Sequence, residues 1–188
     1  MDDRTSPSSL VRHNVEGLTF AFPPAYLLSF LIDAPGEPIA GADDLPLLTR
    51  SRMLGVFGMT YRTELLDGET AARLAAEIAQ YKLYRDIIAS ANGSLLTLQT
   101  PYDESGWDVL QEVSDEGLRA LIFGFKGESG SQRLIVRPRG LQASATYDVS
   151  SLDVGPIGTA RGDTLMQDGI ELVHNAGSLA HVLILIAR

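Results

Sequence analysis

The chain has 188 residues and a formal net charge of −9, and 45% of its residues are hydrophobic while 21% are charged. This composition is typical of a globular protein of one domain, or of one domain and part of a second. The acidic balance without clustered Lys and Arg argues against nucleic acid as a partner, and the absence of cysteine excludes disulfides, cysteine-ligated metals and a thiol nucleophile.

The sequence contains no stretch typical of a secretory signal or of a membrane span. Its first residues are polar, and the apolar stretch 18–32 is interrupted by Pro23 and Pro24. The closing run 179–187 is strongly apolar but shorter than the roughly 20 residues that a spanning helix needs. We therefore expect a cytoplasmic protein without membrane contact.

The chain begins with a half that is predicted to be mainly helical. Residues 7–17 have the pattern of a helix, with Thr5 or Ser6 as its N-cap and proline in the first turn. Residues 25–32 form an apolar segment that is expected to be a buried strand. A core built from so few elements would leave apolar faces uncovered, which indicates that further elements that would cover them are missing from this half.

The rest of this half is predicted to contain a loop and two helices. Proline and acidic residues indicate a loop over 35–46, and 47–57 returns to helical spacing. The clearest helix is expected over 68–90, with Asp67 as its N-cap and Asn92–Gly93 as the residues that end it.

The remainder of the chain is predicted to be a set of short antiparallel strands. β-rich runs alternate with turn signals, and hairpin connections are expected at 115–117 and 126–131. Apolar residues in both phases of 118–125 predict a strand covered on both faces. The expected strands are 95–99, 107–113, 118–125, 133–137, 146–149, 170–174 and 179–187, with a weaker one at 164–166. The predicted fold class is therefore α+β, with a β-sandwich in the second half.

Adjacent carboxylates are the first candidates for catalysis. The pairs at 2–3 and 43–44 could supply an acid and a base, as glycoside hydrolysis requires. Adjacent acids at a terminus or in a loop are, however, usually solvated.

The other candidate motifs favour structural roles. His13, His174 and His181 show no spacing typical of metal ligands, so no metal is predicted, and no cofactor motif is present. The glycine-rich stretch 124–131 lies between expected strands and is interpreted as a turn. Three aromatic residues could form a platform for sugar rings, but packing in the core is favoured: Tyr102, Trp107 and Phe125.

Residues 81–85, at the end of the long expected helix, read Tyr-Lys-Leu-Tyr-Arg and are followed by Gly93 and an expected strand. This arrangement resembles the Tyr-Lys-x-x-Arg signature of glycoside hydrolase family 36, the bacterial-type α-galactosidases. Further segments resemble the family in the same order over nearly the whole chain. They are Arg52 with 53–58, Glu64–Leu65, Gly140–Leu141, Tyr147 with Val149, and 162–170.

The resemblance implies that the chain corresponds to the last part of such an enzyme. Residues 1–91 would be the C-terminal segment of a (β/α)8 catalytic barrel, and 92–188 would be the antiparallel β-sandwich domain that follows it. The complete enzyme would hydrolyse terminal α-galactosides, including oligosaccharides, with retention and without a cofactor. Because the family's nucleophile lies on an earlier barrel strand, the chain alone is expected to be inactive, and its uncovered barrel faces predict a homo-oligomer.

The first residues resemble the segment that carries the family's general acid/base. Residues 3–7 read Asp-Arg-Thr-Ser-Pro and are similar to the family's Ser-Asp-Asn-Thr-Asp-Pro run, whose first Asp has this role. The resemblance assigns the role to Asp3, with Asp2 as the alternative one residue away. The loop 35–46 departs from the family's pattern, so the exact glycoside stays open.

A different class of function is also compatible with the sequence. The second half could be a non-catalytic β-sandwich module for carbohydrate binding or subunit assembly, with the helical half as a dimerisation surface. A sugar-binding module should present an exposed aromatic pair that includes Trp107.

Overall fold

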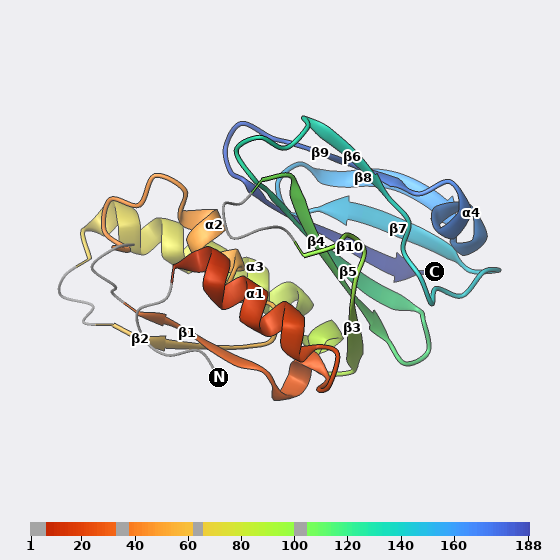
Figure 1. Ribbon diagram of the computed structural model, residues 1–188, viewed down its shortest axis with the longest axis horizontal. Coiled ribbons are helices and arrows are strands. Elements are labelled where there is room, and N and C mark those ends of the chain that lie inside the picture. Colours follow the sequence, from red (N-terminus) through yellow and green to blue (C-terminus); the bar gives the residue numbers. More distant parts are fainter. Residues whose placement is uncertain (1–6, 33–37, 62–65, 100–104) are drawn as a thin grey trace.

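A six-stranded antiparallel sheet lies at the centre of the computed structural model, which describes residues 7–32, 38–61, 66–99 and 105–188 (Figure 1). Its strands are, in order across the sheet, β3 (Ala91–Leu95), β4 (Trp107–Ser114), β5 (Arg119–Lys126), β10 (Ala180–Ala187), β7 (Thr146–Ser151) and β8 (Gly155–Arg161). Every neighbouring pair is antiparallel. The antiparallel arrangement predicted for this half is thus confirmed.

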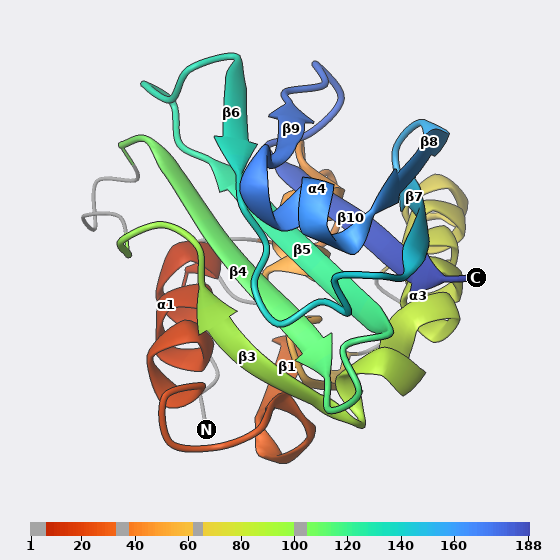
Figure 2. The same ribbon diagram turned by 90° about the vertical axis from the view of Figure 1, so that its right-hand side faces the viewer.

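One face of the central sheet is covered by a second, smaller sheet. Its strands are β6 (Arg133–Val136) and β9 (Ile170–Val173), which the short helix α4 (Gly162–Gln167) precedes. Figure 2 shows β6, β9 and α4 in front of the central sheet. Because side chains alternate along a strand, Trp107, Val109 and Val113 of β4 face this layer and pack with Val136 and Leu172.

The opposite face of the central sheet is covered by helices (Figure 1). They are α1 (Ser8–Leu18), the short η1 (Pro24–Tyr26), α2 (Leu45–Arg50) and α3 (Gly68–Ile88). Leu110 and Phe123 of the sheet pack here with Val15, Leu54 and Tyr84. This core contains residues from both sides of the predicted domain boundary between residues 91 and 92. The division of the chain into two domains at this boundary therefore stays a prediction. Within the described ranges, no helix is both long and apolar enough to cross a membrane.

A separate pair of parallel strands lies beyond the helices. β1 (Leu28–Ile32) pairs with β2 (Val56–Thr60), and α2 lies between them in the sequence. A small core that includes Leu31, Leu48 and Leu74 covers part of this unit. Three large side chains of the pair are nevertheless more than a third exposed: Phe30 (37%), Val56 (42%) and Met59 (38%).

The predicted helices at 7–17 and 68–90 are confirmed. The predicted N-cap of the first helix, Thr5 or Ser6, is wrong, because α1 starts at Ser8 with Pro7 as its N-cap and without a side-chain cap. The Asp67 side chain accepts a hydrogen bond of 2.7 Å from the Thr70 amide and caps α3, as predicted. The prediction that Asn92–Gly93 ends this helix is wrong, because both lie in β3. Gly93 is needed there for a different reason, since a Cβ would press on the Thr19 side chain.

The predicted helix over 47–57 is only partly correct, because α2 ends at Arg50 and β2 begins at Val56. Pairing with β1 decides the conformation of this segment. The backbone approaches so closely at Gly55 that a Cβ would clash with the carbonyl oxygen of Leu27. Helical spacing could not reveal this contact between distant segments.

In the second half, the expected strand at 164–166 is helix α4, and the expected strand at 95–99 is replaced by β3 at 91–95. Strand β8 was not predicted because it contains two glycines and a proline. The turn at 115–117 is confirmed, with Gly117 at a φ of 68°. The segment 126–131 is not a hairpin connection, because β5 and β6 belong to different sheets.

Candidate functional site

The residues to which the resemblance assigns catalysis are not among those that the structure describes. Asp2 and Asp3 both lie outside the described ranges, as does the segment Glu64–Leu65. In the other acidic pair, the two residues have different environments: Asp43 is exposed and Asp44 is partly buried. Asp44 caps α2 and accepts 2.7 Å hydrogen bonds from the Ser178 hydroxyl and the Leu179 amide. Asp44 therefore has a structural role.

The expected packing of the aromatic residues in the core is confirmed for two of the three. Trp107 is 6% exposed and Phe125 is 2% exposed, while Tyr102 lies outside the described residues. The Trp107 indole donates a 2.8 Å hydrogen bond to the carbonyl oxygen of Ser131. Trp107 thus stabilises the interior and presents no platform to a sugar.

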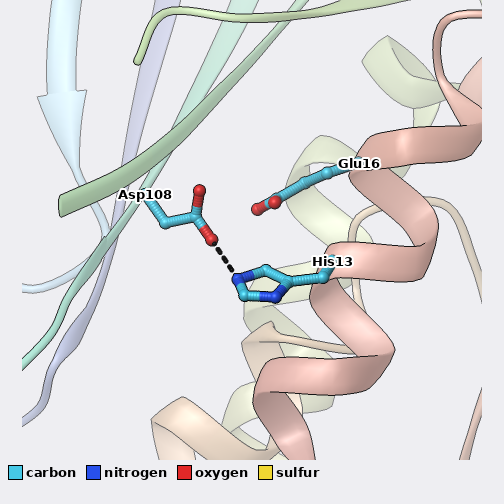
Figure 3. A group of neighbouring side chains, drawn as sticks. All are labelled: His13, Glu16 and Asp108. Carbon is cyan, nitrogen blue, oxygen red and sulfur yellow. Dashed lines mark ion pairs between the residues drawn. The ribbon is translucent and has the colours of Figure 1, made fainter. Parts of the chain in front are cut away.

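Helix α1 and strand β4 bring four charged or titratable side chains together, and Figure 3 shows three of them, His13, Glu16 and Asp108. Arg12, His13 and Glu16 come from one face of α1 and meet Asp108 of β4. Asp108 Oδ2 lies 3.1 Å from Arg12 Nε and 2.9 Å from His13 Nε2. Glu16 Oε1 lies 3.8 Å from Arg12 Nε. Arg12, Glu16 and Asp108 are at most 2% exposed, so the cluster is shielded from water.

The electrostatics of this cluster favour one retained proton. Burial, reinforced by the negative charge of Asp108, raises the pKa of Glu16 to about 9, although Arg12 opposes the shift. Two oxygens in this site, Glu16 Oε1 and Asp108 Oδ1, are buried without a hydrogen-bond partner. One imidazole and two carboxyl groups therefore lie close together, with ligand atoms within 4.8 Å of one another, and such a donor set is able to hold a proton or a cation.

A second polar network is centred on Arg50 at the end of α2. Its guanidinium donates to both carboxylate oxygens of Glu77 at 2.9 and 3.1 Å. It also donates to Asp153 Oδ1 and to the carbonyl oxygen of Ala180, each at 2.7 Å. Arg50 is 3% exposed, so these bonds join α2, α3 and the central sheet within the interior.

Two histidines extend the Arg50 network to the surface. His181 Nδ1 lies 3.1 Å from Asp153 Oδ2, and His181 Nε2 lies 3.4 Å from His174 Nδ1. Because a carboxylate only accepts, His181 donates to Asp153 from Nδ1. Burial opposes the shift, but hydrogen bonds and charges of His181 and Arg50 lower the pKa of Asp153. Burial lowers the pKa of His174.

A hollow of about 520 Å³ borders these histidines. Its walls are mainly apolar and include Val154, Ile157 and Leu183, while Asp153 and His181 also line it. In the described residues, no third metal-ligating side chain joins the two histidines into a metal-binding group.

The spacing of the histidines in the sequence predicts neither cluster. The spacing of His13 and Glu16, three apart on one helix, could have placed them on the same face. Asp108 is more than 90 residues away, and only the packing of α1 on the sheet brings it near. His174 and His181 meet through the arrangement of β9 and β10, for which the sequence carries no local signal.

The sequence matches no protein-family model and no curated protein. The fold, in contrast, is that of a region found in larger glycoside hydrolases. The galactosidase domain of the α-galactosidase–sucrose kinase AgaSK superposes with a TM-score of 0.77 and 20% sequence identity. That match covers 97% of this chain and 25% of the other.

The α-galactosidase AgaA from Geobacillus stearothermophilus gives a TM-score of 0.78 at 19% identity, and the α-galactosidase from Lactobacillus brevis gives 0.76 at 16%. Each match covers 97% of this chain and 25% of the other. The chain thus spans about a quarter of the length of these structures. It has the fold of the C-terminal portion of glycoside hydrolase family 36 α-galactosidases, as the sequence motifs predicted.

Proposed function

We propose that this chain is the C-terminal part of a retaining α-galactosidase-like glycoside hydrolase and is not catalytic by itself. The observation that carries this proposal is the isolated pair of parallel strands, β1 and β2. Parallel sheets occur almost only with both faces covered and with further strands beside them, as in (β/α)8 barrels. A barrel that continues beyond this pair would cover the exposed Phe30, Val56 and Met59.

The chain order around this pair is that of the end of a barrel. A strand, a helix and a parallel strand follow one another as β1, α2 and β2, and α3 comes next. In such barrels the active site lies at the carboxyl ends of the strands, in the loops that lead into the helices. Residues 33–37 follow β1, residues 62–65 follow β2 after Tyr61, and residues 1–6 precede α1 and its N-cap Pro7. In the proposed barrel, these sequence positions would correspond to catalytic loops.

In the proposed enzyme, Asp3 is the general acid/base, with Asp2 as the alternative. Retention requires a second carboxylate about 5 Å away as nucleophile, and an earlier barrel strand would supply it. Terminal α-galactosides are the proposed substrates, because variants of AgaA from G. stearothermophilus have been solved with raffinose and with stachyose. The resemblance assigns no cofactor to this reaction.

The antiparallel half is proposed to buttress the barrel. The support for this role is the core it shares with α1 and α3, together with the buried bonds from Arg50 to Asp153 and Ala180. The alternative role in carbohydrate binding lacks this kind of support, because Trp107 and Phe125 are buried.

The purified 188-residue chain is expected not to hydrolyse an aryl α-galactoside above the rate of a protein-free blank, because only one of the two carboxylates is present. Release of the aryl alcohol measures this directly. Hydrolysis that disappears in the Asp3→Asn variant would overturn the proposed lack of activity.

Sequencing the DNA upstream of the Met1 codon tests whether the chain is the C-terminal part of a longer enzyme. An open frame encoding barrel strands supports it, whereas an in-frame stop contradicts it.

The isolated chain is expected to self-associate through the face of β1 and β2 that carries Phe30 and Val56, because these two large apolar side chains meet water there. Sedimentation velocity should show species larger than the monomer, and Val56→Lys should shift them toward the monomer. Ile186→Lys is the matched control, since Ile186 is 46% exposed on the other side of the molecule. A monomer at all concentrations would contradict this expectation.

A further inference from the structure

We propose that His13, Glu16 and Asp108 form a binding site for a divalent transition-metal ion such as Zn²⁺, which links helix α1 to the central sheet. One ligand atom from each of these side chains lies within 4.8 Å of the others. Ligand atoms around a tetrahedral Zn²⁺ are about 3.3 Å apart, so small side-chain rotations suffice to close the site. This inference does not depend on the proposed glycosidase activity.

The hydrogen bonds around the two carboxylates leave one oxygen of each available. Gln99 donates to Glu16 Oε2 at 3.3 Å, while Glu16 Oε1 has no hydrogen-bond partner. Arg12 donates to Asp108 Oδ2 at 3.1 Å, while Asp108 Oδ1 has none. Donors on the outer oxygens fix the orientation of both carboxylates, as the outer hydrogen bonds of metal ligands commonly do.

Leaving two buried carboxylate oxygens without partners is costly. The proton that Glu16 retains offsets part of this cost in the metal-free chain, and a divalent cation would replace that proton and contact both oxygens. Arg12 Nε lies 3.1 Å from Asp108 Oδ2 and 3.8 Å from Glu16 Oε1, so the proposed cation would lie on the side of the two carboxylates that is away from Arg12. Its guanidinium lies 4.6 Å from the centre of the Phe125 ring and also donates to the Ser51 hydroxyl at 3.4 Å. These contacts hold Arg12 to one side of Asp108, toward Oδ2.

The donor set determines the class of metal. Imidazole nitrogen suits zinc and its neighbours, whereas calcium and magnesium require a shell made of oxygen. Because His13 is slightly exposed, at 11% of its side chain, an ion could enter along its ring and keep a water molecule as a fourth ligand.

The test is calorimetric titration of the metal-free chain with ZnCl₂ at pH 7, together with thermal unfolding. We expect one zinc ion to bind per chain and to raise the Tm by roughly 5–10 °C at a free concentration of 100 Kd. Glu16→Gln keeps the size of the side chain and its contact with Gln99, and is expected to weaken zinc binding at least about tenfold. His13→Gln is a second variant with the same expectation.

His181→Gln is the matched control, because the His174–His181 pair is the competing place for zinc, with ring nitrogens 3.4 Å apart. This variant should bind zinc as the unmodified chain does. The proposal is overturned if the unmodified chain binds no zinc, or if His181→Gln loses binding that Glu16→Gln retains. Equal binding and equal Tm shifts with MgCl₂ would overturn the assignment to a transition metal.

Discussion

Replacing Arg50 by Met is expected to lower the free energy of unfolding by about 3–5 kcal/mol, because the change leaves buried carboxylates without their cation. Glu77 and Asp153 are both bonded to Arg50, which is itself 3% exposed. Denaturant unfolding at pH 7 measures the loss. Arg50→Lys should lose part of this amount, since an ammonium group cannot bond both oxygens of Glu77 in the same way.

The control for this prediction is a surface ion pair whose nitrogen–oxygen distance is similar to that between Arg50 and Glu77. Arg133 lies 3.0 Å from Glu171, but the two side chains are 67% and 42% exposed. Arg133→Met should therefore cost less than about 1 kcal/mol. Similar losses for Arg50→Met and Arg133→Met would mean that burial does not determine the contribution of the Arg50 network.

Stability is expected to fall as the pH rises above about 5, because buried Glu112 is held protonated in the folded state. Glu112 of β4 is fully buried, neither of its carboxylate oxygens has a hydrogen-bond partner, and burial raises its pKa well above the usual 4.5. Above pH 4.5 the unfolded chain releases this proton and the folded chain keeps it. The free energy of unfolding therefore declines with pH, by up to about 1.4 kcal/mol per pH unit for one proton.

Denaturant unfolding between pH 5 and pH 9 measures this slope, and Glu112→Met should flatten it. Tyr81 and Tyr84 lie within electrostatic range of Glu112, and both tyrosines have a raised pKa, caused mainly by burial, so they stay neutral over this range. Glu16 changes stability in the same direction and is unchanged in the Glu112 variant. If the free energy of unfolding of Glu112→Met declines with pH as steeply as that of the unmodified chain, Glu112 is not the group that retains the proton in the folded state.

The buried charged residues share one location, which fits the proposed role of the antiparallel half as a buttress. Asp108, Glu112 and Arg50 all lie where the helices meet the central sheet, and the first two come from the same strand. Polar groups at a helix–sheet boundary require specific partners, so they favour one relative position of the two layers over others. In the proposed enzyme, this position would hold the end of the barrel against the sandwich.

Local signals in the sequence were sufficient for the elements that depend on near neighbours. The Asp67 cap and the apolar spacing identified α3, and the alternating apolar residues identified β4, β5 and β10 with small errors at their ends. Motif order along the chain also identified the fold. Strand β2 and helix α4 were missed because pairing with β1 and packing on the sheet override local preference there.

The class of the fold, the long helix and most antiparallel strands can be predicted from local sequence, because capping and side-chain periodicity act over a few residues. The meeting of Asp108 with His13 and Glu16, and of His181 with Asp153 and His174, is visible only in the folded chain. Only the tertiary structure reveals the parallel pair with an exposed apolar face. The physical reason is that these contacts join segments far apart in the chain, whose meeting depends on how the layers pack.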